Sequence, residues 1–157
     1  MNKVLKLLRY RMYHRLYFSP KTEQEVVDRF HRLYYDAGQF GKTFFKTTWL
    51  GVAISKCPFD LWIYQEILFE LRPDLIIETG SALGGSALYL ACLCDCMGTG
   101  KIVTIDIEKK DARPQHKRIQ YLHGSSVAPD IVSTVRAQIR PTDRVMVIGL
   151  SPVFRRC

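Results

Sequence analysis

The sequence predicts an α/β fold: an incomplete doubly wound, Rossmann-like parallel sheet of about four strands, preceded by a helical N-terminal extension. Two observations predict this class. From residue 74 onward, short apolar segments alternate with helical segments, as parallel strands do with crossover helices. Each short segment is apolar on both faces, which is typical of a sheet covered by helices on both sides.

Length, charge and cysteine content limit the classes of protein to which this chain can belong. With 157 residues and 47% hydrophobic content, the chain is long enough for one domain with a real core. The net charge of +8 suits nucleic acid, anionic lipid or an acidic small molecule, and selects none of them. Five cysteines without a C-x-x-C pair indicate reduced thiols rather than zinc, and no signal peptide is recognisable. We therefore expect a cytoplasmic protein.

Residues 1–57 predict a basic helical extension and an aromatic loop. Apolar residues recur at helical spacing over 1–17 with basic residues between them, so this helix could lie on an anionic membrane or dock on the protein body or a second subunit. Ser19-Pro20 ends it. Thr22 as N-cap and Glu25 form a capping box that opens a second helix, reaching Tyr35. Residues 37–57 lose periodicity and read as a loop.

Residues 58–148 predict the ligand-binding domain. Pro58 opens a helix over 59–71, and a strand over 75–77 leads through a glycine turn into a helix over 86–97. Strands follow at 101–107 and 118–122, a helix at 130–139 and a fourth strand at 144–148. The fourth strand should lie beside the first, on the side away from Asp106, with an exposed edge that predicts poor solubility or pairing with another chain. Residues 149–157 form an atypical tail.

The glycine turn, residues 78–86 (ETGSALGGS), predicts the ligand. Its E-x-G-x-x-x-G-G spacing differs from the dinucleotide G-x-G-x-x-G, and a carboxylate there suits a cationic ligand such as S-adenosylmethionine. Asp106, ending the second strand, is placed to accept ribose hydroxyls, and Ser125-Ser126 follows the third strand, where adenine would lie. The alternative is that Gly84-Gly85 serves close packing and Asp106 caps a loop.

These residues resemble a known family. The segments "WLGVAISKCPFDLWIYQEILFELRPDLIIETGSALGGSALYLA", "GKIVTIDIE", "YLHGSS" and "DRVMVI" are similar to the cephalosporin hydroxylase family, which includes the rhamnosyl O-methyltransferases of glycolipid synthesis. The resemblance implies an S-adenosylmethionine-dependent O-methyltransferase, often oligomeric, acting on a hydroxyl of a small molecule or glycolipid. It places six residues at the methionine end of the cofactor: Glu78, Gly80, Ser81, Gly84, Gly85 and Ser86. Asp106 would hold the ribose, with Ser125 and Ser126 near the adenine.

The resemblance stops after the fourth strand. The family continues there with an L-D-S-D-H type of segment and two strands whose acids can hold magnesium, whereas this chain has Gly149-Leu150-Ser151-Pro152. We therefore expect a C-terminally truncated relative without magnesium ligands, and we assign no catalytic residue; His116 and His123 are only candidates for a base. The alternative is a catalytically incompetent, truncated or frameshifted relative that at most binds the cofactor. An RNA methyltransferase would rest on net charge alone, so we expect no nucleic-acid partner.

Overall fold

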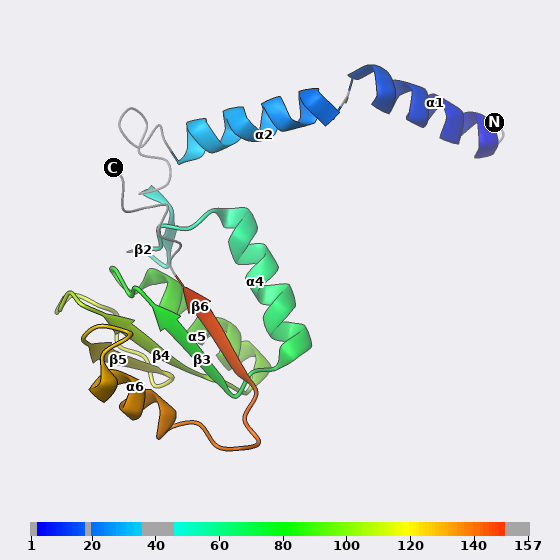
Figure 1. Ribbon diagram of the computed structural model, residues 1–157. Helices are drawn as coiled ribbons and strands as arrows, with labels where there is room; N and C mark the ends of the chain where they lie inside the picture. Colours follow the sequence, from blue (N-terminus) through cyan, green and yellow to red (C-terminus); the bar gives the residue numbers. More distant parts are fainter. Residues whose placement is uncertain (1–2, 18–19, 36–45, 150–157) are drawn as a thin grey trace. The chain divides into compact units, whose positions relative to one another are not determined.

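The computed structural model describes residues 3–17, 20–35 and 46–149 (Figure 1). The chain divides into two compact units, Met1–Phe44 and Phe45–Cys157, which we describe one at a time. The predicted domain boundary after Cys57 stays a prediction. Residues 37–45 of the predicted aromatic loop and residues 150–157 of the predicted tail lie outside the described residues.

The described part of the first unit contains helices α1 (Lys3–Tyr17) and α2 (Pro20–Tyr34). Both were predicted, but the capping box at Thr22 is wrong: α2 begins at Pro20, because proline suits the first helical position, where no N–H acceptor is needed. The apolar residues of α2 share one exposed face: Val26, Val27, Phe30 and Leu33. In α1 the exposed apolar residues surround the helix instead, since Leu7 and Tyr10 lie away from the stripe that contains Leu5 and Leu8.

The second unit is built on a four-stranded parallel sheet. Its strands are β3 (Leu75–Thr79), β4 (Lys101–Asp106), β5 (Ile119–His123) and β6 (Val145–Gly149). They lie in the order β5-β4-β3-β6. This order confirms the predicted doubly wound α/β fold, including the place of the fourth strand beside the first, on its far side from β4.

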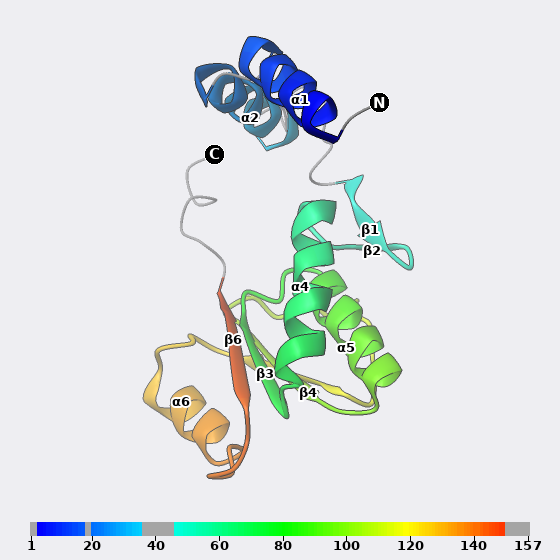
Figure 2. The same ribbon diagram turned by 90° about the vertical axis from the view of Figure 1, so that its right-hand side faces the viewer.

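In the described part of this unit, helices cover both faces of the sheet. Figure 2 shows α4 (Pro58–Leu71) and α5 (Gly85–Met97) on one face and α6 (Pro129–Arg136) on the other. One apolar cluster joins Leu68 and Leu90 to Ile76 of β3; a second joins Ile131 of α6 to Val103 of β4. Helix α6 ends earlier than predicted because the chain tightens there: Gln138 and Ile139 donate their backbone N–H groups to carbonyls three residues back.

A short hairpin precedes α4, within the segment predicted as a loop. Strands β1 (Thr48–Trp49) and β2 (Val52–Ala53) pair antiparallel. The two turn residues, Leu50 and Gly51, have φ of 48° and 82°, as a two-residue type I′ turn requires. Trp49 packs edge-on against Tyr89 of α5, with 4.9 Å between ring centroids. Strands of two residues carry no detectable periodicity, so the sequence reading missed them.

The outer strand β6 departs from the prediction that every strand is buried on both faces. Ile148 is buried in the α4/α5 core, whereas Val145 and Val147 are 37% and 67% exposed. Among the described residues β6 pairs only with β3, so its outer edge is open. The predicted pairing with another chain stays a prediction. In the described part of the chain, no helix has the length and apolar character needed to cross a membrane.

Candidate functional site

The predicted site residues gather at the carboxyl edge of the sheet. Thr79 ends β3 opposite Ile105, and Asp106 ends β4 opposite His123, so these strands finish level with one another. The glycine turn leaves β3 at this edge, and the Gly80 N–H donates to the Ile105 carbonyl at 2.8 Å. Carboxyl ends of parallel strands are the usual ligand-binding edge of open α/β sheets.

Both glycines that start α5 are needed for close packing. Gly84 has φ of +82°, and a Cβ there would lie 2.7 Å from the Tyr121 hydroxyl and 2.8 Å from Pro114 Cδ. A Cβ on Gly85 would overlap the carbonyl of Ala53 in β2. The packing role considered for Gly84-Gly85 is therefore real, and it brings the hairpin and the segment after β4 against the turn.

The start of α5 also contributes to the electrostatics of the site. Gly84 is the N-cap residue and supplies no side-chain cap. The first N–H groups of any α-helix lack an acceptor one turn back, and the aligned peptide dipoles make that end positive. This part of the turn is suited to a carboxylate or another anion.

Glu78 lies at the centre of a buried hydroxyl network. Its side chain accepts hydrogen bonds from the Ser86 hydroxyl at Oε1 and the Thr104 hydroxyl at Oε2, the latter 2.7 Å long. Ser81 Oγ lies 2.7 Å from Thr104 Oγ1. Because the Thr104 proton points at Glu78, Ser81 must donate to Thr104. Glu78 is 2% exposed, so this network holds the turn against β4 from within.

Burial raises the pKa of Glu78 above its usual range. The hydroxyls of Ser86 and Thr104 and the charge of Lys56 oppose this rise by stabilising the carboxylate, whereas Asp106 adds to it. Lys56 follows the hairpin, with its Nζ 5.4 Å from the centre of the Tyr64 ring. The environment thus combines a buried acid with one nearby cation.

Asp106 binds protein groups with both carboxylate oxygens. Oδ2 accepts the Ala82 N–H at 2.8 Å and Arg113 Nη2 at 3.1 Å, while Oδ1 accepts the Glu108 N–H at 2.9 Å. Its side chain is 12% exposed. Asp106 therefore does cap the loop that follows it, and it also fixes the glycine turn through Ala82.

Arg113 is the main site residue that the sequence reading missed. Its side chain is only 6% exposed, and Nε donates to the Ala82 carbonyl at 3.0 Å. Nη2 donates to Asp106 and, at 2.9 Å, to the Glu108 carbonyl. A single buried guanidinium thus joins the glycine turn, the end of β4 and the next loop. No local pattern around Arg113 signals this role.

Tyr121 of β5 supports Arg113. The guanidinium carbon lies 5.5 Å from the centre of the Tyr121 ring, and the Tyr121 hydroxyl donates to the Pro114 carbonyl at 3.0 Å. Burial raises the pKa of Tyr121 to about 12, although Arg113 works in the other direction. The phenol therefore stays protonated and keeps its hydrogen bond across the physiological range.

The remaining predicted residues lie at the edges of this site. Ser125 is half-buried and accepts the Val127 N–H at 3.4 Å, while Ser126 is exposed. His123 Nε2 lies 3.1 Å from the Ile107 carbonyl, so it is the protonated ring nitrogen. His116 instead pairs with Asp95 at 3.2 Å, at the other end of α5 from the glycine turn.

Thr104 was also missed, although a signal existed. It is a polar residue in the apolar strand "KIVTID", and the parallel register sets it opposite Glu78. Two buried polar residues on neighbouring strands need each other as hydrogen-bond partners. The register that unites them is a property of the sheet, which the sequence pattern alone does not supply.

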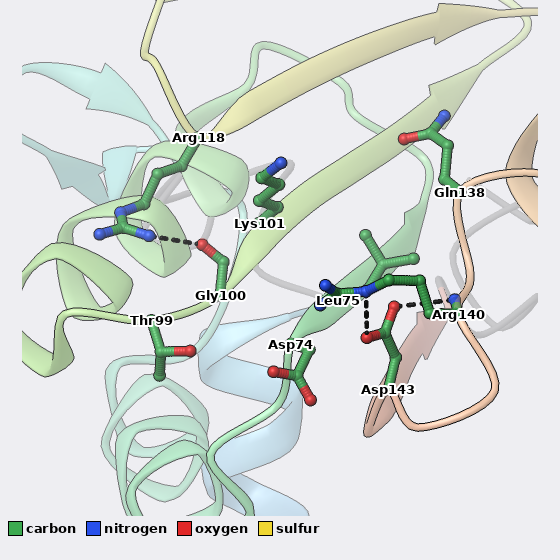
Figure 3. Close-up of a pocket in the computed structure, with 9 residues that line it drawn as sticks. All are labelled: Asp74, Leu75, Thr99, Gly100, Lys101, Arg118, Gln138, Arg140 and Asp143. Atoms are coloured by element: carbon green, nitrogen blue, oxygen red, sulfur yellow. Dashed lines mark hydrogen bonds and ion pairs between the residues drawn. The ribbon is translucent and has the colours of Figure 1, made fainter.

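A cavity of about 500 Å³ lies at the opposite, amino-terminal edge of the sheet. Figure 3 shows its charged lining, in which Arg140 is bonded to Asp143 and Arg118 to the Gly100 carbonyl. Arg140 and Asp143 pair with each other, Arg118 pairs with Asp95, and the predicted site residues lie elsewhere. Across the described residues, no group of three or more His, Cys, Asp and Glu side chains could hold a metal ion.

Comparison with protein families matches residues 42–152 to the family described as Rhamnosyl O-methyltransferase/CmcI. The rhamnosyl O-methyltransferase of Mycobacterium leprae (strain TN) is 39% identical over 119 residues, covering 74% of this chain and 50% of that protein. The rhamnosyl O-methyltransferase of Mycobacterium bovis (strain BCG / Pasteur 1173P2) is 35% identical over 125 residues, covering 77% and 49%. The chain spans about half the length of these relatives.

Solved structures of CmcI share the fold. An apo structure aligns with a TM-score of 0.57 and 23% identity, covering 70% of this chain and 47% of that one. A CmcI structure with Mg-SAM aligns with a TM-score of 0.57 and 23% identity, covering 71% and 48%. At this identity the likeness supports the α/β fold and extends no further.

Proposed function

Since the chain belongs to the Rhamnosyl O-methyltransferase/CmcI family, we propose that it binds S-adenosylmethionine at the glycine turn and serves O-methylation of a hydroxyl group on a small molecule or glycolipid. One observation carries the proposal: the glycine turn, the uncapped start of α5 and the Asp106 carboxylate meet at one edge of the sheet. Ser125 and Ser126 follow the next strand along that edge.

The residues present fit the methionine end of the cofactor in two ways. The positive end of the α5 dipole, which no side chain caps, suits its carboxylate. The buried Glu78 gives the turn a negative potential that suits the ammonium and sulfonium charges. Both Glu78 oxygens already accept hydroxyl protons, so we assign it an indirect role through the turn rather than a direct contact. Ser81 and Ser86 belong to the same supporting network.

The nucleoside end fits the neighbouring strand ends. Asp106 keeps one lone pair for ribose after its protein bonds are counted, and the partly exposed Ser125-Ser126 pair offers polar groups for adenine. S-adenosylmethionine supplies the electrophilic methyl group when bound. The described residues bind and orient it; we assign no base and no metal role to them.

Calorimetric titration of the full chain with S-adenosylmethionine and S-adenosylhomocysteine tests binding. Asp106→Ala should weaken binding at least tenfold, because ribose loses a charged acceptor and the glycine turn loses the hydrogen bond from the Ala82 N–H to Asp106. Asp95→Ala is the matched control: it removes an equal charge whose partners, His116 and Arg118, lie away from the turn. Absence of binding to the wild-type chain would refute the cofactor assignment.

Methyl transfer needs its own test, with labelled cofactor and a rhamnosyl glycolipid as acceptor. We propose this acceptor because the matched relatives are named rhamnosyl O-methyltransferases. Transfer that disappears in Asp106→Ala would support an active enzyme. Cofactor binding with no transfer to any hydroxyl acceptor would instead favour the alternative, a relative that binds the cofactor and does not catalyse.

We also propose that the protein self-associates and touches anionic membranes. Helix α4 exposes an apolar stripe at helical spacing, with Phe59 71%, Trp62 65% and Phe69 62% exposed, and we propose this stripe as the contact with a second copy. Light scattering should show a dimer or larger species that Trp62→Glu dissociates.

Residues 1–17 carry the basic helix α1, and binding to anionic but not zwitterionic vesicles would support the membrane contact.

A further inference from the structure

We infer that Arg113 is a positioning residue that commits one oxygen of Asp106 to the protein, so that the cofactor's ribose is held at Asp106 through a single hydroxyl group, on Oδ1. This inference rests on the proposed function, because it concerns how the proposed cofactor is held. It departs from the symmetrical arrangement in which one acid accepts both ribose hydroxyls.

The acceptor capacity of Asp106 carries the inference. Each carboxylate oxygen has two lone pairs. Those of Oδ2 are taken by the Ala82 N–H and by Arg113. Within residues 3–17, 20–35 and 46–149, Oδ1 accepts only the Glu108 N–H, which leaves one lone pair for a ligand. With these bonds in place, Asp106 can accept one ribose hydroxyl and not two.

The geometry of Arg113 explains why the assignment of oxygens is fixed. Its planar fork donates at once to the Ala82 carbonyl, Asp106 Oδ2 and the Glu108 carbonyl. Ala82 is thereby held twice, by its N–H on Asp106 and by its carbonyl on Arg113. Rotating the carboxylate would break bonds on both sides, and a buried guanidinium left without its acceptor is costly.

Packing behind the Arg113 guanidinium prevents it from moving away from Asp106. The Tyr121 ring lies against Arg113, and the Tyr121 hydroxyl holds Pro114. Pro114 Cδ fills the space that a side chain at Gly84 would need. The loop, the arginine and the glycine turn therefore form one unit, and the ligand meets an Asp106 that is already oriented.

The test uses the full wild-type chain and three probes: S-adenosylhomocysteine and its 2′-deoxy and 3′-deoxy forms. One deoxy form should bind about 10- to 100-fold more weakly than the parent, because it loses a hydrogen bond to a charged acceptor. The other should bind within about threefold of the parent. Equal large losses with both forms would overturn the inference, since Asp106 would then hold both hydroxyls.

Arg113→Lys tests the role of the arginine. An ammonium cannot reproduce the fork, so Oδ2 is released and the difference between the two deoxy forms should shrink to about threefold or less. A merely structural role would weaken all three probes by a common factor and leave their ratio unchanged. Arg118→Lys is the control, because Arg118 pairs with Asp95 away from the turn, and it should preserve the ratio.

The outcomes separate the two proposals. Binding of S-adenosylhomocysteine with no loss for either deoxy form would remove Asp106 as the ribose ligand and overturn the inference, while cofactor binding would stand. No binding of the parent compound would overturn both. Thermal melting of each variant shows whether it is folded; if Arg113→Lys fails to fold, the wild-type comparison of the two deoxy forms still decides the single-hydroxyl claim.

Discussion

The two edges of the four-stranded sheet hold their charges in different ways. At the carboxyl edge, Glu78 and Arg113 are buried, and their partners are hydroxyls and backbone groups of the glycine turn and its neighbours together with the Asp106 carboxylate, itself only 12% exposed. At the amino edge, charged side chains line an open cavity and bond to one another; Arg140, 76% exposed, reaches Asp143 at 2.9 Å. The carboxyl-edge contacts fix the backbone of the glycine turn, whereas the amino-edge contacts largely pair charged side chains near the surface.

The pKa directions follow the same division. Burial raises the pKa of Glu78 at the carboxyl edge. Hydrogen bonds from Arg140 lower the pKa of Asp143, and those from Arg118 and Lys117 lower the pKa of Asp95. A carboxyl group whose pKa is raised by burial destabilises the folded state when it is ionised. Such groups cluster at functional sites. The contrast therefore points to the carboxyl edge as the working end of the domain.

The largest effect should come from Asp106→Ala, which leaves the buried Arg113 without its carboxylate. We expect a loss of about 3 kcal/mol in the free energy of unfolding, the usual result of breaking a buried ion pair from one side. Urea denaturation at neutral pH measures it. Asp95→Ala, at the other end of α5, should lower stability clearly less; equal losses would mean that the two edges do not differ.

Glu78→Gln should change how stability depends on pH. Because burial raises the pKa of Glu78, the folded state holds its proton more tightly than the unfolded state. This contribution is fully present below the ordinary glutamate pKa and is lost as pH rises through the raised value. The glutamine keeps the side-chain shape without the charge, although its NH2 group replaces one of the two oxygens that accept the Ser86 and Thr104 hydroxyls, so that one of these bonds must reverse or be lost. The loss of this bond does not depend on pH, so the stability of the variant relative to wild type should still increase with pH. Denaturation curves over a pH series test this.

At the amino edge the pKa shift has the opposite direction, so stability changes with pH in the opposite way. The pKa of Asp143 is lowered, so its contribution is present above the ordinary aspartate pKa and is lost as pH falls through the lowered value. Asp143→Asn should therefore remove stability mainly at neutral pH and little in acid. The same pH series as for Glu78→Gln provides the measurement. A parallel trend in both variants would contradict the contrast between the edges.

A smaller effect should follow from Ala82→Gly. Ala82 has φ of +45°, a left-handed conformation that costs a residue with Cβ about 1–2 kcal/mol. Glycine removes this cost but adds chain entropy to the unfolded state, so we expect a net gain of about 1 kcal/mol or less. Ala87→Gly, in the buried right-handed turn of α5, should destabilise instead. Thermal melting compares the two.

The smallest effect should come from Arg140→Ala at the amino edge. Arg140 itself is 76% exposed, and although the Asp143 side chain is only 6% exposed, it keeps the backbone N–H of residue 140 as a donor after the substitution, so the loss should be small. We expect the melting temperature to change by no more than about 2 °C. A larger drop would show that the amino-edge charges are structural in the same sense as those around Asp106.

Much of the fold could be predicted because its signals are local. Pro58 at the start of α4, Gly98 at the end of α5 and the alternation of apolar segments with helices each act over a few residues. The errors are also local: Pro20 starts α2 in place of Thr22, and the hairpin strands are too short for any period. The exposure of Val147 was missed because it depends on which elements pack against β6, and the residues of the strand do not show this.

The sequence by itself determined the order of elements, the glycine turn at the end of β3 and the acid at the end of β4, since each is written in adjacent residues. Only the tertiary structure decided what these groups bind. Ser81 and Thr104 are 23 residues apart, Glu78 and Thr104 are 26 apart, and Arg113 lies 31 residues from Ala82. Such partners meet through the register of the sheet and the path of a loop. Local pattern cannot contain them, because no spacing rule connects residues so far apart.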